Sequence, residues 1–459
     1  MTRTLIAGGT VVSDRESVRA DVLIDGEHIE AVGNDLDASG AAVIDAAGMY
    51  LLPGGIDVHT HLDMPLGEIS SSDDFYSGHV AAAFGGTTTH IDFCNQDRGQ
   101  TLHQALEVWH AKARDKACID YGFHVTLTDI TPEILDEIAE LPAAGVISIK
   151  MLMAYKGRVM VRDDELFLAL QRARDAGILT LVHCENGDVI DVLVAQTLAA
   201  GHTAPRYHPS TRPSQLEGEA TGRAIAMAEI LDAPLYVVHV TCESALARVR
   251  EARGRGSRVW AETCVQYLFF TAEDLDRDGF EGAKWVCSPP FRTSSDRDAL
   301  WQALSSGDLD IVSTDHCPFL FATQKVLGRG DFSRIPNGCP GIEDRLVVLH
   351  QGGVNGGHFD LARFVALTSA TPARLFGLEQ KGRIAPGYDA DIAIWSMNLA
   401  RTVSVERSHS NVDYNLYEGM KVLGAPENVF RRGELIVDGT AFLARAGSGR
   451  YVHRALPRT

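Results

Sequence analysis

The chain has 459 residues, enough for more than one domain, and its 45% apolar and 22% charged residues are ordinary for a globular protein. Its formal net charge of −19 argues against binding to nucleic acid or to an anionic membrane. No stretch has the apolar length of a transmembrane helix, and the first residues do not form a signal peptide. The eight cysteines are scattered and form no Cys-x-x-Cys motif, so we expect reduced thiols and a cytoplasmic protein.

The first segment, residues 1–52, is predicted to be all β. Short strand-like runs separated by Gly, Asp and Asn cover Thr4–Val12, Ala20–Asp25, His28–Val32 and Ala42–Asp45. The dipeptide Asp25-Gly26 is a hairpin turn signal between two of these runs.

In residues 53–376, short apolar runs alternate with longer helix-like segments. The predicted strands are Ile56–His61, Thr87–Phe93, Ile119–Thr126, Val146–Met151, Ile178–Cys184, Leu235–Val240, Arg258–Glu262 and Asp310–Asp315. The predicted helices are Thr101–Ala113, Glu133–Leu141, Asp164–Ala176, Gly218–Leu231, Ser244–Arg253, Arg297–Leu304 and, after the last strand, Leu361–Phe376. This alternation predicts an α/β fold, a closed (β/α)₈ barrel. The absence of a Gly-x-Gly-x-x-Gly turn after the first strand disfavours a dinucleotide-binding domain.

Residues 377–440 return to β-structure. The strand-like runs are Asp389–Ser396, Thr402–Val405, Val429–Arg431 and Glu434–Val437. The simplest packing joins them to residues 1–52 as a small β-sandwich beside the barrel. The tail, residues 441–459, carries four arginines around Tyr451, namely Arg445, Arg450, Arg454 and Arg458. It could clamp a neighbouring subunit or be a frayed terminus.

Residues with metal-ligand chemistry stand at the carboxyl ends of five predicted strands. They are His59, His61, Lys150, His183, His239 and Asp315. Strand ends of a barrel converge on the face where barrel active sites lie. The His-x-His pair alone could be two hydrogen-bonded core histidines, but six such residues at one face indicate a site, because buried polar groups need partners.

These side chains favour a two-metal centre. Four imidazoles and a carboxylate suit Zn²⁺ or a similar divalent ion, and they exceed what one catalytic zinc needs. The ammonium of Lys150 has no lone pair, whereas a carbamate formed from CO₂ would be an anion able to bridge two metals. Taken alone, Lys150 could instead be a rim lysine paired with an acidic residue.

Ten stretches carry a family resemblance. They are Gly55-Ile56-Asp57-Val58-His59-Thr60-His61, Phe84-Gly85-Gly86-Thr87-Thr88-Thr89, Lys150 with Met153-Ala154-Tyr155-Lys156, His183-Cys184-Glu185-Asn186, Glu217-Gly218-Glu219-Ala220, Val237-Val238-His239-Val240, Ser288-Pro289-Pro290, Thr314-Asp315-His316-Cys317-Pro318, Gly328-Arg329-Gly330-Asp331-Phe332 and Ile335-Pro336-Asn337-Gly338. In these stretches, and over nearly its whole length, the chain resembles the dihydropyrimidinase and D-hydantoinase family of the amidohydrolase superfamily.

The resemblance implies a two-zinc centre bridged by carboxylated Lys150 (N6-carboxylysine) and a homotetramer. It further implies that His59 and His61 hold the buried metal with Asp315, while His183 and His239 hold the more exposed one.

The resemblance also assigns residues to the substrate. Tyr155 matches the oxyanion donor of the family, and Ser288 and Asn337 match positions that grip the cyclic amide. Tyr155 could otherwise be a core or rim aromatic, and Ser288 and Asn337 could be ordinary turn residues.

The chain departs from many relatives at Met151-Leu152, where they carry a bulkier aromatic residue, and in having Cys184 after His183. We expect four apolar residues to form the pocket wall, namely Leu62, Met64, Leu66 and Leu152. Because of the departures at Met151-Leu152 and Cys184, the preferred substrate size is the least determined property.

The function implied is hydrolysis of the ring amide of dihydropyrimidines or 5-substituted hydantoins to N-carbamoyl amino acids. A metal-bridging hydroxide would attack the carbonyl, and Asp315 would act as general base and then acid. The rival interpretations are another cyclic amidohydrolase, of the dihydroorotase or allantoinase type, and a non-catalytic scaffold protein of this family. Retention of all six ligand-type residues disfavours the scaffold.

Overall fold

The computed structural model describes residues 3–456, and its largest unit is a parallel barrel. Eight strands pair in the order β17-β16-β15-β14-β13-β12-β11-β8. They are β8 (Gly55–Thr60), β11 (Thr87–Asn95), β12 (Asp120–Thr126), β13 (Ser148–Leu152), β14 (Leu179–His183), β15 (Leu235–Val237), β16 (Val259–Cys264) and β17 (Ile311–Ser313). All eight correspond to predicted strands. Their nearly complete burial explains why they are continuous apolar runs in the sequence.

The barrel closes between its first and last strands. The His61 amide donates to the carbonyl of His316, just beyond β17, at 2.9 Å. The fully buried guanidinium of Arg345 donates to the carbonyls of Ile56 on β8 and Val312 on β17, at 2.8 and 3.1 Å. The first bond joins the carboxyl ends of β8 and β17, and Arg345 joins the two strands nearer the amino end of β8.

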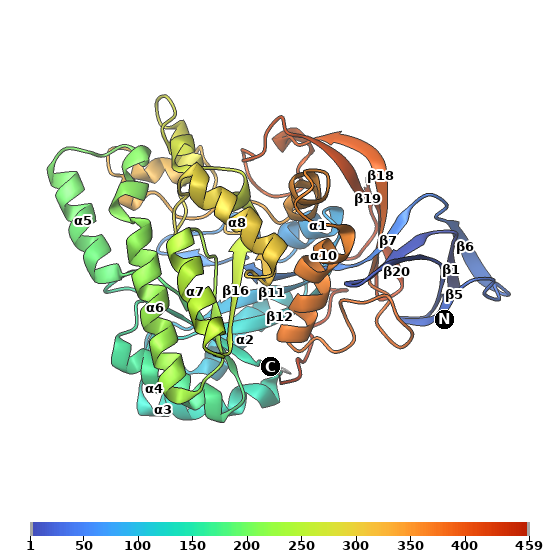
Figure 1. The fold of residues 1–459 in the computed structure, drawn as a ribbon, viewed down its shortest axis with the longest axis horizontal. Coiled ribbons are helices and arrows are strands. Elements are labelled where there is room, and N and C mark those ends of the chain that lie inside the picture. Colours follow the sequence, from blue (N-terminus) through green and yellow to red (C-terminus); the bar gives the residue numbers. More distant parts are fainter. Residues whose placement is uncertain (1–2, 457–459) are drawn as a thin grey trace.

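Helices cover this sheet, most of them on the left side of Figure 1. They are α1 (Ser77–Phe84), α2 (Leu102–Ala113), α3 (Pro132–Glu137), α4 (Asp163–Asp175), α5 (Gly187–Ala199), α6 (Ser214–Leu231), α7 (Glu243–Gly254), α8 (Ser294–Ser306), α9 (Arg345–Leu349), α10 (Leu361–Val365) and α11 (Thr371–Leu375). Of these, α1 and α10 lie near the centre of Figure 1. Side-chain caps mark several starts, such as Thr101 before α2 and Thr293 before α8. A short hairpin, β9 (Pro65–Leu66) and β10 (Ile69–Ser70), follows β8.

Both ends of the chain build the second unit, on the right of Figure 1. One sheet has the order β5-β4-β1-β6 and the other β21-β20-β19-β18-β7-β2-β3. The strands are β1 (Arg3–Ala7), β2 (Thr10–Val12), β3 (Ser17–Arg19), β4 (Asp21–Asp25), β5 (His28–Gly33), β6 (Ala41–Asp45), β7 (Tyr50–Pro53), β18 (Ile392–Thr402), β19 (Lys421–Arg431), β20 (Glu434–Asp438) and β21 (Ala441–Phe442). Apolar residues from both sheets, including Ile6, Leu51, Ile392 and Phe430, pack into one core.

Several strand boundaries of the sandwich differ from prediction, and two of the differences have a clear structural basis. The expected strand Thr4–Val12 is divided at Gly8, whose φ of +76° turns the chain, so that β1 and β2 join different sheets. The expected strand Thr402–Val405 is wrong, because β18 ends at Thr402 and a 3₁₀ turn occupies Val405–Arg407.

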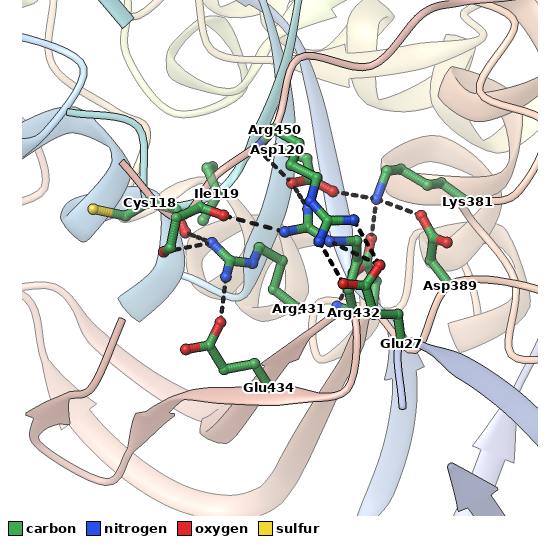
Figure 2. A network of polar contacts seen from close by, with 12 residues as sticks. Glu27, Cys118, Ile119, Asp120, Lys381, Asp389, Arg431, Arg432, Glu434 and Arg450 are labelled. Atoms are coloured by element: carbon green, nitrogen blue, oxygen red, sulfur yellow. Dashed lines mark hydrogen bonds and ion pairs between the residues drawn. The ribbon is translucent and has the colours of Figure 1, made fainter. Parts of the chain in front are cut away.

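A buried ionic network joins the sandwich to the amino end of the barrel (Figure 2). The Nζ atom of Lys381 lies 2.8 Å from Asp120 at the start of β12, 2.9 Å from Asp389 and 2.7 Å from Asp391. Arg432, in the turn between β19 and β20, also pairs with Asp120. This network lies at the end of the barrel opposite the carboxyl ends of the strands.

The described part of the tail, up to residue 456, packs on the barrel of its own chain. The Tyr121 amide donates to the Arg450 carbonyl at 2.9 Å, and the Val452 amide donates to the Tyr121 carbonyl at 2.8 Å. Arg454 is buried and donates to the Phe123 carbonyl. Arg458 lies outside the described residues. Among residues 3–456, no helix combines the length and apolar character needed to cross a membrane.

Candidate metal centre and substrate cavity

Six side chains with ligand chemistry meet at the carboxyl end of the barrel. The Nε2 atoms of His59 and His61 each lie 3.1 Å from Oδ1 of Asp315. The Lys150 amine lies 3.0 Å from Nε2 of His59. On the other side of the group, Nδ1 of His183 lies 2.9 Å from Nε2 of His239, a residue whose ring centroid is 5.4 Å from that of His59.

Two buried glutamates orient these rings. Glu262 accepts from Nδ1 of His59 at 2.5 Å, and Glu185 accepts from Nε2 of His183 at 2.8 Å. When one ring nitrogen donates a hydrogen bond to a carboxylate, the other nitrogen presents its lone pair, as in metal-binding histidines. The bare nitrogens of His59 and His183 face Asp315 and His239.

This arrangement fits divalent cations. Lone pairs that face one another at about 3 Å repel unless a proton or a cation lies among them. Burial lowers the pKa of His61 to about 4 and that of His239 well below its usual value, which favours neutral, ligand-type imidazoles. The Nδ1 atoms of both rings are buried and have no hydrogen-bond partner within the described chain.

The charged groups also suit a metal site. Burial opposes ionisation of Asp315, but the imidazoles of His59 and His61 outweigh it and hold the pKa of the carboxyl well below its usual value. Burial lowers the pKa of Lys150, which favours the neutral amine that can react with CO₂. The hydroxyl of Thr126, paired in register with Lys150 on the neighbouring strand, is buried and unpartnered among residues 3–456.

Three residues of the site hold an unusual backbone conformation. Tyr155, His239 and Asp315 have φ of +67°, +41° and +50°. Such values are uncommon for residues other than glycine, and each costs about 1–3 kcal/mol. His239 and Asp315 lie two residues beyond the last residue of β15 and β17, so these turns direct both side chains over the mouth of the barrel.

A cavity of about 1020 Å³ is lined by five of the six side chains, all except the fully buried His59. The three residues predicted to contact substrate meet in its wall. The Asn337 side-chain amide donates to Ser288 Oγ at 3.1 Å, and Tyr155 lies in the same wall. Burial raises the pKa of Tyr155, so its hydroxyl remains a donor at neutral pH.

The chain was compared with known proteins. It matches the amidohydrolase family over residues 50–436. The chain belongs to this family. It is 49% identical to a D-hydantoinase of Geobacillus stearothermophilus, over 98% of this chain and 96% of that protein. It is 47% identical to a D-hydantoinase of Streptomyces coelicolor, over 99% and 98% of the two chains. The crystal structure of a dihydropyrimidinase from Brevibacillus agri aligns with a TM-score of 0.99 and 51% identity, covering 100% of both chains.

These similarities confirm the predicted resemblance to the dihydropyrimidinase and D-hydantoinase family. They also confirm the predicted barrel and the sheet domain built from both termini. Met64, Leu66 and Leu152 line the cavity, and their contact with the substrate stays a prediction. Leu62 does not line the cavity, and this prediction was wrong. Side chains alternate along extended chain, so the residue after His61 points away from the cavity and is buried against Gly78 of α1.

Several residues of this amidohydrolase's site were not anticipated. Glu262 was recognised only as the last residue of a predicted strand, although a carboxylate at that end of a barrel strand was a usable signal. Arg212 donates to Glu185 at 2.6 Å and lies 5.4 Å from the Tyr155 ring centroid, a link across loops that the sequence does not mark. Arg158 and Arg334 bring cationic side chains to the cavity wall.

Proposed function

We propose that this chain is a metal-dependent cyclic amidohydrolase. It opens the ring amide of dihydropyrimidines or 5-substituted hydantoins to give N-carbamoyl amino acids. The observation that carries the proposal is the group of six ligand-type residues below a cavity lined by Tyr155, Ser288 and Asn337, in a chain 49% identical to a D-hydantoinase.

The proposed cofactors are two divalent ions, Zn²⁺ by the chemistry of the donors, with Lys150 as a carbamate between them. His59, His61 and Asp315 would hold one ion, and His183 and His239 the other. When bound, such ions activate water at neutral pH and polarise a carbonyl oxygen. Elemental analysis after dialysis should find close to two divalent ions per chain, and one ion or none at full activity would contradict the assignment.

The protein's own groups would do three things. The Asp315 carboxylate, ionised at neutral pH, would take the proton of the attacking water and pass it to the ring nitrogen that leaves. The Tyr155 hydroxyl, which stays protonated because burial raises its pKa, would donate to the developing oxyanion. Ser288 and Asn337 would bind the cyclic amide, while Met64, Leu66 and Leu152 would contact the exocyclic group.

We further propose a cytoplasmic homotetramer. All eight cysteines are free and buried, which fits a reducing compartment. On α5, Val189 and Val192 are 40% and 54% exposed, an apolar surface that a neighbouring subunit could cover. Sedimentation of the purified protein tests the assembly, and a stable monomer would contradict it.

The activity is tested with a panel of rings: dihydrouracil, 5-methylhydantoin, 5-phenylhydantoin, dihydroorotate and allantoin. We expect turnover of the first three, lost on chelation and regained with Zn²⁺. Arg158 and Arg334 in the wall make dihydroorotate an informative comparison, because its carboxylate could pair with a cation. Preference for dihydroorotate or allantoin would reassign the substrate, and no turnover of any ring by metal-loaded protein would favour a scaffold.

A further inference from the structure

Lys325 is a fully buried lysine beneath the loops that carry Ser288 and Asn337. It begins a 3₁₀ helix, Lys325–Gly328, in the long segment after β17. Its Nζ atom donates to the carbonyl of Val286 at 2.8 Å and to the carbonyl of Gly338 at 2.7 Å.

The surroundings of Lys325 contrast with those of an ordinary buried ion pair. Burial lowers the pKa of Lys325, and the groups that oppose this shift within the described chain are the thiols of Cys339, Cys287 and Cys317. The buried imidazole of His208 also interacts with its charge. Burying an amine away from water is costly unless its N–H groups are bonded, and apolar replacements of buried charges are often no less stable. What this lysine adds is its pair of donated bonds, which a neutral amine and an ammonium can both supply.

The two acceptors belong to the two segments that carry Ser288 and Asn337. Val286 lies two residues before Ser288, and Gly338 directly follows Asn337. The Gly338 amide also donates to the Val286 carbonyl at 3.0 Å, and the two side chains are bonded to each other at 3.1 Å. The Nζ atom therefore bridges two backbone segments that are about fifty positions apart in sequence, and it reinforces the direct hydrogen bonds between them.

We propose that Lys325 is a positioning residue for substrate binding. It holds the Ser288 and Asn337 segments at the separation that a cyclic amide requires. It contacts neither the substrate nor the six ligand-type residues. This rests on the proposed function, in which those two residues grip the ring. Loss of the clamp weakens binding of the ring in the ground state and the transition state alike, which raises KM more than it lowers kcat.

The chain offers a matched control in Lys381. Its side chain is also almost fully buried, but its partners are three carboxylates in the network between barrel and sandwich (Figure 2). It does not line the cavity. Lys325→Met and Lys381→Met therefore remove the same group from two interiors, of which only one adjoins the substrate residues.

The experiment measures KM and kcat for 5-methylhydantoin, metal content and melting temperature in the parent and both variants. We expect Lys325→Met to raise KM about tenfold or more while kcat changes less than about threefold and metal content stays the same. Lys381→Met should lower the melting temperature and leave KM unchanged. Lys325→Gln, which keeps two N–H donors on a shorter side chain, should give an intermediate KM.

An unchanged KM in Lys325→Met, whatever its melting temperature, would overturn the proposal. KM does not depend on the folded fraction, so partial misfolding cannot imitate the expected result. If neither variant of Lys325 folds while Lys381→Met does, Lys325 is a core residue and the proposal is also overturned. An inactive parent enzyme would instead refute the proposed function, so the two failures are distinguishable.

Discussion

Glu262→Gln should weaken metal binding at His59 while leaving the shape of the site unchanged. The carboxylate is fully buried on β16 and accepts two hydrogen bonds, from Nδ1 of His59 at 2.5 Å and from the Tyr236 hydroxyl at 3.0 Å. Glutamine has nearly the same volume but only one acceptor oxygen. The glutamine oxygen can accept from His59 or from Tyr236, but not from both through separate oxygens. Its NH₂ group then points at the donor that is left without an acceptor.

The expected loss of metal affinity follows from what carboxylate partners of metal-binding histidines contribute. Loss of an outer carboxylate behind a metal-binding histidine typically costs 10–100-fold in metal affinity, which is about 1.4–2.7 kcal/mol. Because the carboxylate and the His59 ring are both fully buried, water cannot replace the lost bond, and we expect the upper half of that range. At saturating metal the loss in kcat/KM should be smaller, since the ligands themselves remain.

The assay removes metal with a chelator and titrates Zn²⁺ into the apoprotein against a chromophoric competitor. Tyr236→Phe is the control, because it removes the second bond to Glu262 and leaves the first, and its affinity should stay within about threefold of the parent. If Glu262→Gln binds both ions as tightly as the parent, Glu262 does not orient His59 for a metal.

Three further substitutions test single residues. Lys150→Ala should abolish activity and lower metal content, with partial recovery on adding short carboxylates such as acetate; normal metal content and rate would make Lys150 a simple ion-pair residue. Tyr155→Phe should lower kcat about a hundredfold to a thousandfold with the metals in place, and a loss under about threefold would assign the ring to packing. Leu152→Ala should raise kcat/KM for 5-phenylhydantoin relative to 5-methylhydantoin, on the scale of about 1–3 kcal/mol per methylene, and an unchanged ratio would exclude Leu152 from the substituent pocket.

The barrel was predictable because a parallel strand covered on both sides is a short, continuous apolar run. Helices α1 and α5 were not predicted, because each lacks the polar–apolar period that marks an amphipathic helix. Six of the eight residues of α1 are buried, and α5 is apolar although only two of its residues are buried. Most of β19 was missed because Gly424 and Pro426 interrupt the strand pattern, and register shifts between β18 and β19 accommodate them.

The ligand-type residues of the site were predictable for the same reason as the strands. Each lies at or just beyond the end of an apolar run, so the barrel geometry alone brings them together. Arg212 and Lys325 were not predictable. Both lie in the irregular segments between barrel strands. Their partners, Glu185 for Arg212 and Val286 and Gly338 for Lys325, are brought near only by the folding of those segments.

This division separates two functions within one site. The strand ends and the buried glutamates behind them hold the ligand-type side chains on the rigid sheet, whereas Tyr155, Ser288 and Asn337 come from loops held by Arg212 and Lys325. Changes to the first group should therefore act on metal affinity and kcat together. Changes to Ser288, Asn337 and the residues that hold their segments should act on KM and on the choice between rings, because they alter the wall of the cavity and not its floor. Tyr155 is the exception in this group, because a donor to the developing oxyanion acts on kcat. A loop substitution that removed metal, or a strand-end substitution that altered only KM, would show that the two parts are not independent.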